Sequence, residues 1–414
     1  MARPAETDPR FSRCSSSRTI CAVRRSYGTV TLCAVKVAIV TESFLPQVNG
    51  VTGSVCRVLE QLAARGHQAL VVAPRPGPES YAGARVELVP GVRLPFYSSV
   101  VVGLPTRRVT SVLRDFAPDV VHLAAPMMLG VSGLAAAERL DVPAVAVFQT
   151  DIAGFARRYG LRGTDPTVWW WLRRVHGRAD RTLAPSTPVL AELDRRGVPR
   201  LSLWGRGVDR RRFNPAHRSP ETRAALAPDG EVLVGYVGRL AAEKRPKMLA
   251  TLADLPGTRL VIVGDGPEER RLRRLMPDAV FTGFQTGTEL SRLMASLDVF
   301  VHTGADETFC QAVQEALACG VPVVAAAAGG PLDLVRPGVN GLLYAPDDGD
   351  GLRAAVAALA ADPDLRRRLG AGSLASVEGR GWDVVCEQLI DHYLQAAGGE
   401  CAREAAVQRA DDAA

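Results

Sequence analysis

Short apolar runs that end in glycine or polar residues recur along the whole chain, and most are followed by a helix-like pattern. In the first half they occupy residues 36–42, 119–126, 144–151 and 181–186. In the second half they occupy residues 231–239, 259–267, 279–284, 298–304 and 322–330. Runs of this length alternating with helices are typical of buried parallel strands, so the sequence predicts an α/β fold. Because the arrangement occurs twice, we expect two facing Rossmann-like domains with a cleft between them.

The boundaries follow from breaks in this pattern. The proline-containing stretch 213–223 is the predicted linker, and residues 381–397 have apolar positions at helical spacing. The predicted parts are a disordered extension (1–34), a first domain (35–215) completed by the helix 381–397, a second domain (216–380) and a disordered tail (398–414). The extension is rich in Arg and Ser and has no apolar period, which is the reason for expecting disorder there.

Charge is divided unequally between the halves. Residues 36–218 carry 25 basic and 14 acidic side chains, whereas residues 219–414 carry 19 and 28. A basic first half fits nucleic acid, an anionic membrane surface, or simply scattered solvated arginines. The basic residues form no recognised nucleic-acid motif, so a nucleic-acid partner is not expected. Nothing in the sequence indicates an oligomeric state.

The eight cysteines include no C-x-x-C pair and no zinc spacing. This usage indicates a reduced, cytoplasmic protein. No run of 18 uninterrupted apolar residues is present, so no transmembrane helix is predicted. Asp-x-Asp triplets at 348–350 and 362–364 lie in a turn and before a helix, where turn and N-cap carboxylates are the simpler interpretation. The sequence therefore predicts no metal site.

Polar residues at the ends of predicted strands mark one crevice in the first domain. Glu42, His122, Gln149 and Asp151 follow three strands, and ligands of open α/β sheets bind beyond the carboxyl ends of strands. In the second domain, Arg239 ends a strand and Lys244 follows five residues later. Two such cations can clamp a diphosphate, although a pair of solvated surface charges is the competing interpretation.

The stretch "ADETFCQAVQEALACG" (305–320) places Glu307 just before a predicted helix and Glu315 two turns inside it. We expect this helix to begin near Thr308 or Phe309. The unpaired amides around Phe309, Cys310 and Gln311 would then favour an anion. Glu307 can accept hydrogen bonds from sugar hydroxyls and Glu315 from a ribose diol. The alternatives are a dipole partner for Glu307 and a solvent-facing position for Glu315.

This stretch resembles the E-x7-E signature of retaining glycosyltransferases of family 4, which have the GT-B fold. "GYVGRLAAEKRP", "LVIVGDGPE", "GVDRRRFNP" and "TESFLPQVNGVTGSV" are similar to other blocks of that family in the same order. The resemblance covers roughly residues 35–395. "FQTDIAGFARRYG" and "RRVHGRADRTLAPS" are most similar to actinobacterial GDP-mannose-dependent α-mannosyltransferases that act on membrane glycolipids.

The resemblance implies roles for individual residues. Glu307 would bind the donor sugar, Arg239 and Lys244 the diphosphate, and Glu315 the ribose. The remaining implied donor-binding positions are Gly50, Gly238, Phe281, Gly283, Phe309, Cys310 and Gln311. The implied sugar or acceptor positions are Asn49, Gln149, Asp151 and Tyr159. Gln149 departs from the family, since many members have His there.

The resemblance therefore implies a retaining α-mannosyltransferase that uses GDP-mannose, needs no metal or cofactor, and acts on a membrane glycolipid. The acceptor would be a phosphatidylinositol mannoside or a glucuronosyl diacylglycerol. Trp169–Trp171 and the arginines of the first domain favour peripheral attachment to an anionic surface at the inner face of the plasma membrane. The alternatives are a family 4 enzyme with another donor or a soluble acceptor, a sugar-nucleotide epimerase on the same fold, and a non-catalytic binding module.

Overall fold

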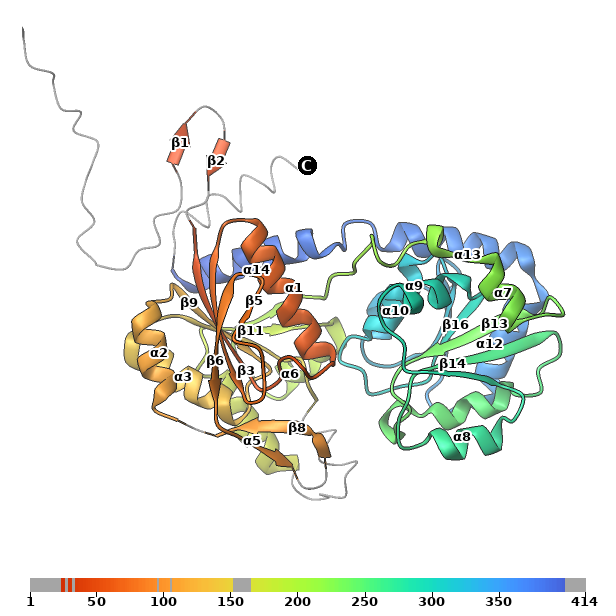
Figure 1. Ribbon diagram of the computed structural model, residues 1–414, viewed down its shortest axis with the longest axis horizontal. Coiled ribbons are helices and arrows are strands. Elements are labelled where there is room, and N and C mark those ends of the chain that lie inside the picture. Colours follow the sequence, from red (N-terminus) through yellow and green to blue (C-terminus); the bar gives the residue numbers. More distant parts are fainter. Residues whose placement is uncertain are drawn as a thin grey trace, which may run out of the picture.

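The computed structural model describes residues 24–26, 29–31, 34–94, 97–104, 106–151 and 165–398. It contains two α/β domains that lie side by side, each built on a parallel sheet (Figure 1). The predicted α/β class with two Rossmann-like domains is confirmed. Tyr159 and the tail beyond residue 398 lie outside the described residues.

The first domain is built on an eight-stranded sheet in the order β12-β11-β10-β9-β3-β4-β6-β5. Its strands are β3 (Lys36–Thr41), β4 (Gln68–Pro74), β5 (Ser80–Tyr81), β6 (Ala84–Val89), β9 (Val120–Ala124), β10 (Ala144–Val147), β11 (Arg181–Ala184) and β12 (Leu201–Leu203). All neighbours pair in parallel except β5 and β6. The central strands are mostly apolar because helices cover both faces of the sheet, and His122 on β9 is a buried polar exception.

The helices of this domain are α1 (Gly50–Ala64), α2 (Arg108–Phe116), α3 (Met128–Leu140), α5 (Asp165–His176) and α6 (Thr187–Arg195). Two separate antiparallel pairs are formed by β7 (Gly91–Leu94) with β8 (Tyr97–Gly103), and by β1 (Arg24–Ser26) with β2 (Thr29–Thr31). The β1–β2 pair falls within the segment predicted to be disordered, most of which lies outside the described residues.

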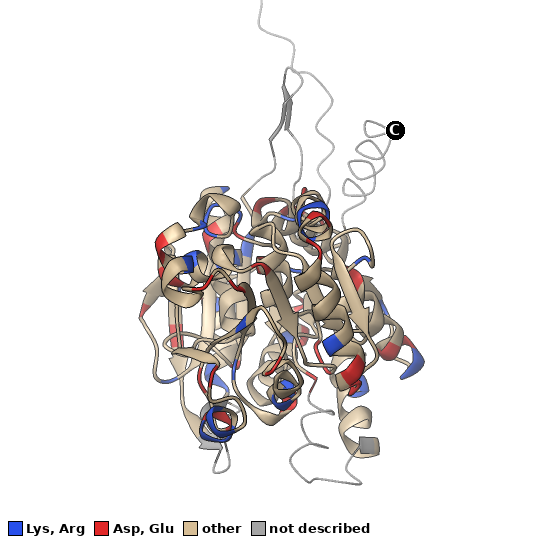
Figure 2. Ribbon diagram, turned by 90° about the vertical axis from the view of Figure 1, so that its right-hand side faces the viewer, with Lys and Arg blue, Asp and Glu red and all other residues tan. Residues whose placement is uncertain are grey.

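The second domain has a six-stranded parallel sheet in the order β15-β14-β13-β16-β17-β18. Its strands are β13 (Val232–Val237), β14 (Thr258–Val263), β15 (Val280–Gly283), β16 (Val299–His302), β17 (Val323–Ala326) and β18 (Gly341–Tyr344). Its α-helices are α7 (Pro220–Leu226), α8 (Glu269–Leu275), α9 (Gly287–Ser296), α10 (Gln311–Ala318), α11 (Pro331–Leu334), α12 (Gly349–Ala361) and α13 (Pro363–Ser376). Short 3-10 helices are η1 (Pro215–His217), η2 (Ala242–Lys244) and η3 (Pro246–Leu252). Seen from this domain's end, basic and acidic residues alternate along the ribbon without separating into two regions (Figure 2).

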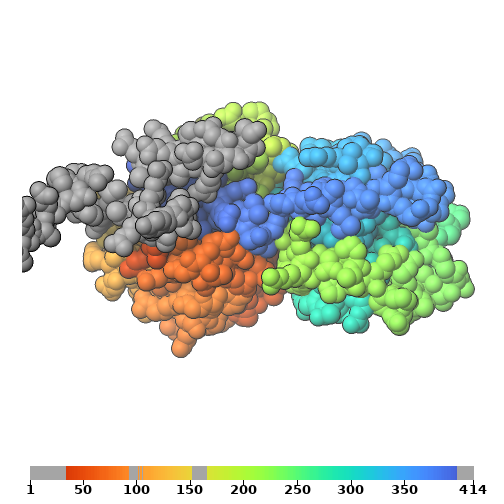
Figure 3. Space-filling model, turned by 90° about the horizontal axis from the view of Figure 1, so that it is seen from above, coloured from red at the N-terminus to blue at the C-terminus, as the bar shows by residue number. Residues whose placement is uncertain are grey.

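The last helix, α14 (Trp382–Ala396), packs into the first domain. Figure 3 shows the C-terminal segments running along the top of both domains. The Trp204 indole donates to the carbonyl oxygen of Val385 at 2.9 Å, and the Tyr393 hydroxyl lies 2.6 Å from His122 Nδ1. The outgoing and returning segments are adjacent, because the Val208 amide donates to Arg380 O at 2.9 Å. The chain therefore crosses from the first domain to the second near Val208 and returns near Arg380, and the two crossings lie side by side.

Candidate functional site

Lys244 and Glu307 come together at the carboxyl ends of β13 and β16. Lys244 lies in η2 after β13, and Glu307 lies in the loop after β16. Lys244 Nζ is 2.5 Å from Glu307 Oε1, and Thr303 Oγ1 donates to Lys244 O at 2.7 Å. The second hydrogen bond fixes the backbone of η2 against the β16 loop. An ammonium and a carboxylate are thus held where ligands of parallel sheets bind.

Arg239 lies in the loop between β13 and η2. Its guanidinium is partly exposed and forms an ion pair with Glu243. Gly238, just before it, lies against the loop after β14. A Cβ at Gly264 would be 2.1 Å from Gly238 O, and Gly264 has φ of +136°, so that position requires glycine. The two loops can approach closely only for this reason.

The residues predicted near the base lie at the edge strand β15. The Arg273 guanidinium lies 4.5 Å from the centre of the Phe281 ring. Gly283 has φ of +72°, and its carbonyl oxygen accepts a hydrogen bond of 2.8 Å from the Gly264 amide. Phe281 and Gly283 are therefore joined to the loop that contacts Gly238. Their role in binding the base stays a prediction.

Helix α10 begins at Gln311, so the predicted start near Thr308 or Phe309 is wrong. The carbonyl of Glu307 accepts from the Gly330 amide at 2.8 Å, and that of Thr308 accepts from Ser186 Oγ at 2.8 Å. These carbonyls bind other loops instead of a helical turn. Cys310 has φ of +80°, a left-handed conformation that is unfavourable for a residue with a side chain. The buried Phe309 and Cys310 therefore precede the helix, and Gln311 donates to Gly207 O at 3.1 Å.

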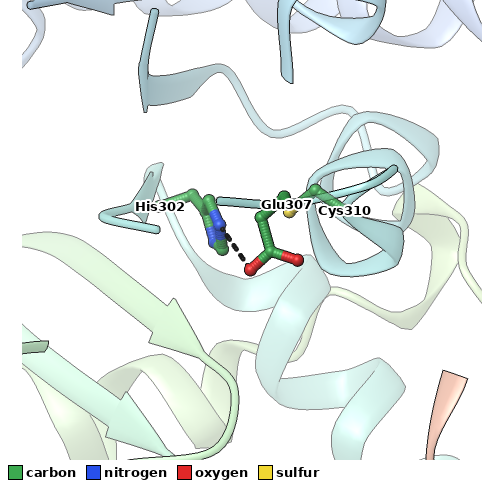
Figure 4. Close-up of side chains that lie close together, drawn as sticks. All are labelled: His302, Glu307 and Cys310. Atoms are coloured by element: carbon green, nitrogen blue, oxygen red, sulfur yellow. Dashed lines mark ion pairs between the residues drawn. The ribbon is translucent and has the colours of Figure 1, made fainter. Parts of the chain in front are cut away.

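Glu307 lies among groups that stabilise its negative charge. Nε2 of the buried His302 is 3.3 Å from Glu307 Oε1 (Figure 4). Burial alone would raise the pKa of Glu307, but Lys244 and His302 outweigh it and hold that pKa well below its ordinary value. Burial would likewise lower the pKa of His302, yet Cys310 and Glu307 beside it raise it to about 10. Glu307 is therefore ionised and available as a hydrogen-bond acceptor.

His302, Glu307 and Cys310 are the one group of His, Cys and carboxylate residues in the described part of the chain whose ligand atoms lie close enough to hold a metal ion, within 4.8 Å of one another. The ammonium of Lys244 already pairs with the carboxylate, and the charge of Arg206 acts on it too. This electrostatic setting favours an anion or a hydroxyl over a cation. The Asp-x-Asp triplets are helix caps, as the simpler interpretation predicts: Asp348 caps α12 and Asp362 caps α13.

The first domain contributes Gln149 and Arg206 to the same region. Gln149 follows β10, and its Oε1 accepts a hydrogen bond of 2.9 Å from Arg206 Nη2. The carbonyl oxygen of Gln149 accepts from Thr308 Oγ1 at 3.1 Å, which joins it to the Glu307 loop. Asp151 is the last described residue of this segment. The Asn49 side chain caps α1 by accepting from the amides of Val51 and Thr52, so that oxygen already has a structural role.

Glu42 and His122 do not face the crevice, which corrects the prediction made from strand ends. The buried Glu42 carboxylate accepts hydrogen bonds from the amides of Gly103, Leu129 and Gly130. His122 is buried against Tyr393, and burial lowers its pKa to about 3. Both residues serve the core of the first domain.

The sequence interpretation missed two residues, His302 and Arg206. His302 is the last residue of β16, where the rule on strand ends would have found it. Arg206 lies three residues after β12 and immediately before the quoted block that starts at Gly207. Their partners come from other loops, so only the three-dimensional structure brings them to Glu307.

Glu315 lies one turn inside α10, near Arg212 and Gln311. It retains some exposed surface, but burial dominates and raises its pKa to about 7, against the opposing effect of Arg212. A folded carboxyl with a raised pKa keeps its proton while the unfolded chain, at an ordinary value of 4.5, has released it. The folded state then binds more protons between these two pH values, so this contribution to stability falls as pH rises.

We therefore expect Glu315→Gln to stabilise the nucleotide-free protein relative to wild type at pH 8 by about 1–3 kcal/mol, and to have little effect near pH 4.5. Urea unfolding at both pH values measures the difference. The exposed Glu289, in the first turn of α9, serves as a control when changed to Gln. A pH-independent difference for Glu315→Gln would contradict the assignment.

Comparison with known proteins identifies the family. The profile "Glycosyl transferases group 1" matches residues 218–373, and "Glycosyltransferase Family 4" matches residues 48–212. A "GDP-mannose-dependent alpha-mannosyltransferase" of Mycobacterium tuberculosis is 51% identical over 87% of this chain and 97% of its own length. The chain belongs to the family 4 glycosyltransferases.

Further relatives extend this result. A protein of the same description from Corynebacterium glutamicum is 48% identical over 86% of this chain and 88% of its own length. Among solved structures, Anabaena HepE in complex with UDP has a TM-score of 0.71 at 20% identity and covers 86% of this chain and 99% of its own. WaaG, a glycosyltransferase involved in lipopolysaccharide biosynthesis, has a TM-score of 0.65 at 18% identity, covering 86% and 99%. These likenesses confirm the GT-B fold, and the enzyme is a glycosyltransferase of a retaining family.

Proposed function

We propose that this chain transfers mannose from GDP-mannose, with retention of configuration, to a membrane glycolipid. The observation that carries the donor assignment is the identity of 48–51% to GDP-mannose-dependent α-mannosyltransferases over most of both chains. The site is consistent with that reaction, since it pairs cations for a diphosphate with a carboxylate for a sugar. No cofactor or metal has a role in the proposed reaction.

The proposed roles follow from charge and position. Lys244 and Arg239 would balance the negative charge that grows on the diphosphate as the sugar leaves. Glu307, ionised beside Lys244, would accept a hydrogen bond from a hydroxyl of the donor sugar. Glu315 would accept from the ribose. Gly50 would allow close approach of the substrate to the start of α1.

The glycolipid acceptor is supported by the surface of α5. Trp169 is 6% exposed, whereas the next residue, Trp170, is 55% exposed with the Arg174 guanidinium 6.0 Å from its ring centre. An exposed Trp beside Arg suits the interface of an anionic membrane, where each basic residue contributes about 1 kcal/mol. No helix within the described ranges is long and apolar enough to span a bilayer. We accordingly propose peripheral attachment at the inner face of the plasma membrane and an acceptor of the phosphatidylinositol mannoside or glucuronosyl diacylglycerol type.

A family 4 enzyme with a soluble acceptor is the second candidate. The D-inositol 3-phosphate glycosyltransferase of Actinosynnema mirum is 32% identical over 67% of this chain and 72% of its own length. Its lower identity ranks this candidate below the first.

The test is a transfer assay that crosses donors with acceptors. The donors are GDP-mannose, GDP-glucose, UDP-glucose and UDP-N-acetylglucosamine. The acceptors are phosphatidylinositol mannoside, glucuronosyl diacylglycerol and inositol phosphate, with the lipids in anionic vesicles. We expect mannose on one lipid acceptor, released by α-mannosidase. Transfer from a UDP-sugar or to inositol phosphate would favour the second candidate, and donor isomerisation without acceptor would indicate an epimerase.

A further inference from the structure

Arg206 is a buried arginine located where the two domains meet. It is 8% exposed and follows β12 of the first domain. A Cβ added at Gly50 would be 2.6 Å from Arg206 Nη1, so the guanidinium lies directly against the first residue of α1. On the second domain, the negative charge of Glu307 acts on this guanidinium.

The polar groups around Arg206 are incompletely satisfied. Its Nη2 donates to Gln149 Oε1, but Arg206 Nε and Gln149 Nε2 are buried without a hydrogen-bond partner. Gln149 is itself 6% exposed. No carboxylate among the described residues forms an ion pair with Arg206, and burial lowers the pKa of the guanidinium to about 10 despite the effect of Glu307. A buried cation left in this state is costly.

The N-terminal end of α1 adds to the cost of burying the positive charge of Arg206. The N-terminus of this 15-residue helix carries partial positive charge, and Arg206 places a full positive charge beside it. The Lys244 ammonium, across the domain boundary, binds the same carboxylate on which Arg206 acts. These three positive features lie close to a fourth, the His302 imidazole, whose pKa is raised to about 10, and Glu307 is the carboxylate that contacts both Lys244 and His302. The arrangement is balanced only when an additional anion enters.

We infer that Arg206 is a catalytic residue that binds the diphosphate of the donor from the first domain, opposite Lys244, and that Gln149 is its positioning residue. This inference rests on the proposed transfer from a nucleoside diphosphate sugar. The inference also explains why Gln149 stands where many family members have His. A neutral amide acceptor holds the guanidinium, whereas a protonated His at that position would repel it.

The reaction requires positive charge at this place. The bond between the anomeric carbon and the diphosphate oxygen breaks, and its electron pair stays on the diphosphate. A new bond joins the anomeric carbon to the acceptor oxygen, and the acceptor proton passes to the leaving diphosphate. Before that proton arrives the diphosphate carries one more negative charge than it did in the donor. A guanidinium already fixed in a buried site stabilises this charge without reorganising.

The first experiment compares Arg206→Met with wild type by calorimetry, using GDP, GMP, UDP and UMP. The measured quantity is the ratio of the affinity for the nucleoside diphosphate to that for the monophosphate of the same base, for the base that the wild type binds. We expect this preference to fall 10- to 100-fold and kcat to fall about 100-fold. Arg206→Lys should be intermediate, since it keeps a charge but loses the planar fork. Arg181→Met is the matched control, because Arg181 is a half-buried arginine of the same domain that donates to Ser202.

Measurements of thermal stability distinguish binding of the diphosphate by Arg206 from a purely structural role of this residue. If Arg206 only joined the domains, Arg206→Met would lower the Tm of the nucleotide-free protein and leave the diphosphate preference unchanged. We expect the reverse: an unchanged or higher Tm, and a smaller rise in Tm on adding the diphosphate. An unchanged preference would overturn the inference. A wild type that prefers UDP would contradict the proposed donor but leave the inference testable through UDP and UMP.

A double-mutant cycle tests Gln149. We expect Gln149→Met to lower kcat and the diphosphate preference three- to ten-fold in the wild type, and to have no further effect in Arg206→Met. Additive losses would overturn the assignment of Gln149 as the residue that positions Arg206.

Discussion

Replacing Glu307 by alanine is expected to lower the transfer rate about 100-fold while nucleoside diphosphate affinity stays equal or rises. A hydrogen bond from a sugar hydroxyl to a carboxylate contributes roughly 1.5–3 kcal/mol. If it strengthens in the transition state, its loss appears in kcat. Removing the carboxylate also releases the Lys244 ammonium, 2.5 Å away, toward the diphosphate. Initial rates with the proposed donor and calorimetry with GDP measure the two effects.

Glu307→Gln is the matched variant, since it keeps the shape and one acceptor oxygen while it removes the charge and replaces the other oxygen with an NH2 donor. Its rate should lie between those of wild type and Glu307→Ala. A loss of nucleotide affinity as large as the loss of rate would show that Glu307 binds the nucleotide and not the sugar. Full activity of Glu307→Ala would remove it from the site altogether.

Truncating Tyr393 should destabilise the protein by about 3–5 kcal/mol, the usual cost of deleting a buried aromatic ring. Tyr393 lies on α14, is fully buried, and bonds to His122 at the centre of the first domain's sheet. Tyr393→Ala leaves a cavity and an unpaired histidine nitrogen. Denaturant unfolding followed by tryptophan fluorescence reports on this domain, because Trp204 and Trp382 pack in the same core as Tyr393.

Tyr393→Phe separates the two contributions. It keeps the ring and removes the hydroxyl, so a loss of about 1–2 kcal/mol is expected. Leu275→Ala, at an exposed position on α8, is the control for a truncation outside the first domain. An equal, small effect of all three changes would mean that α14 contributes little to the core.

The sequence predicts the architecture well because strand periodicity is a local signal. The runs at 36–42 and 231–239 become β3 and β13 with nearly the expected bounds. The resemblance assigns Lys244 and Glu307 to two parts of one donor, and the structure places their side chains 2.5 Å apart. The start of α10 is wrong because the carbonyls of Glu307 and Thr308 bind Gly330 and Ser186, which are remote in sequence.

The polar residues at strand ends show again that contacts between residues remote in sequence cannot be predicted from local pattern. Glu42 is a polar residue at the end of a strand, as expected for a site residue, yet three backbone amides donate hydrogen bonds to its carboxylate. Arg206 also follows a strand, but its contacts are with the start of α1 and with Gln149, and the charge that acts on it is Glu307 of the second domain. Position along a strand predicts which edge of a sheet a side chain approaches. Whether it reaches solvent, core or ligand depends on loops brought in by tertiary packing.

The adjacent crossings at Val208 and Arg380 give the second domain the topology of an insertion. Its chain enters and leaves through one narrow connection, and its hydrophobic cores exclude α14. A segment with neighbouring ends can be exchanged between relatives without rebuilding the strands of the host. Gln149 and Arg206 of the first domain meet the Glu307 loop of the second, so an exchanged module would keep its function only if its own loop fits those two residues.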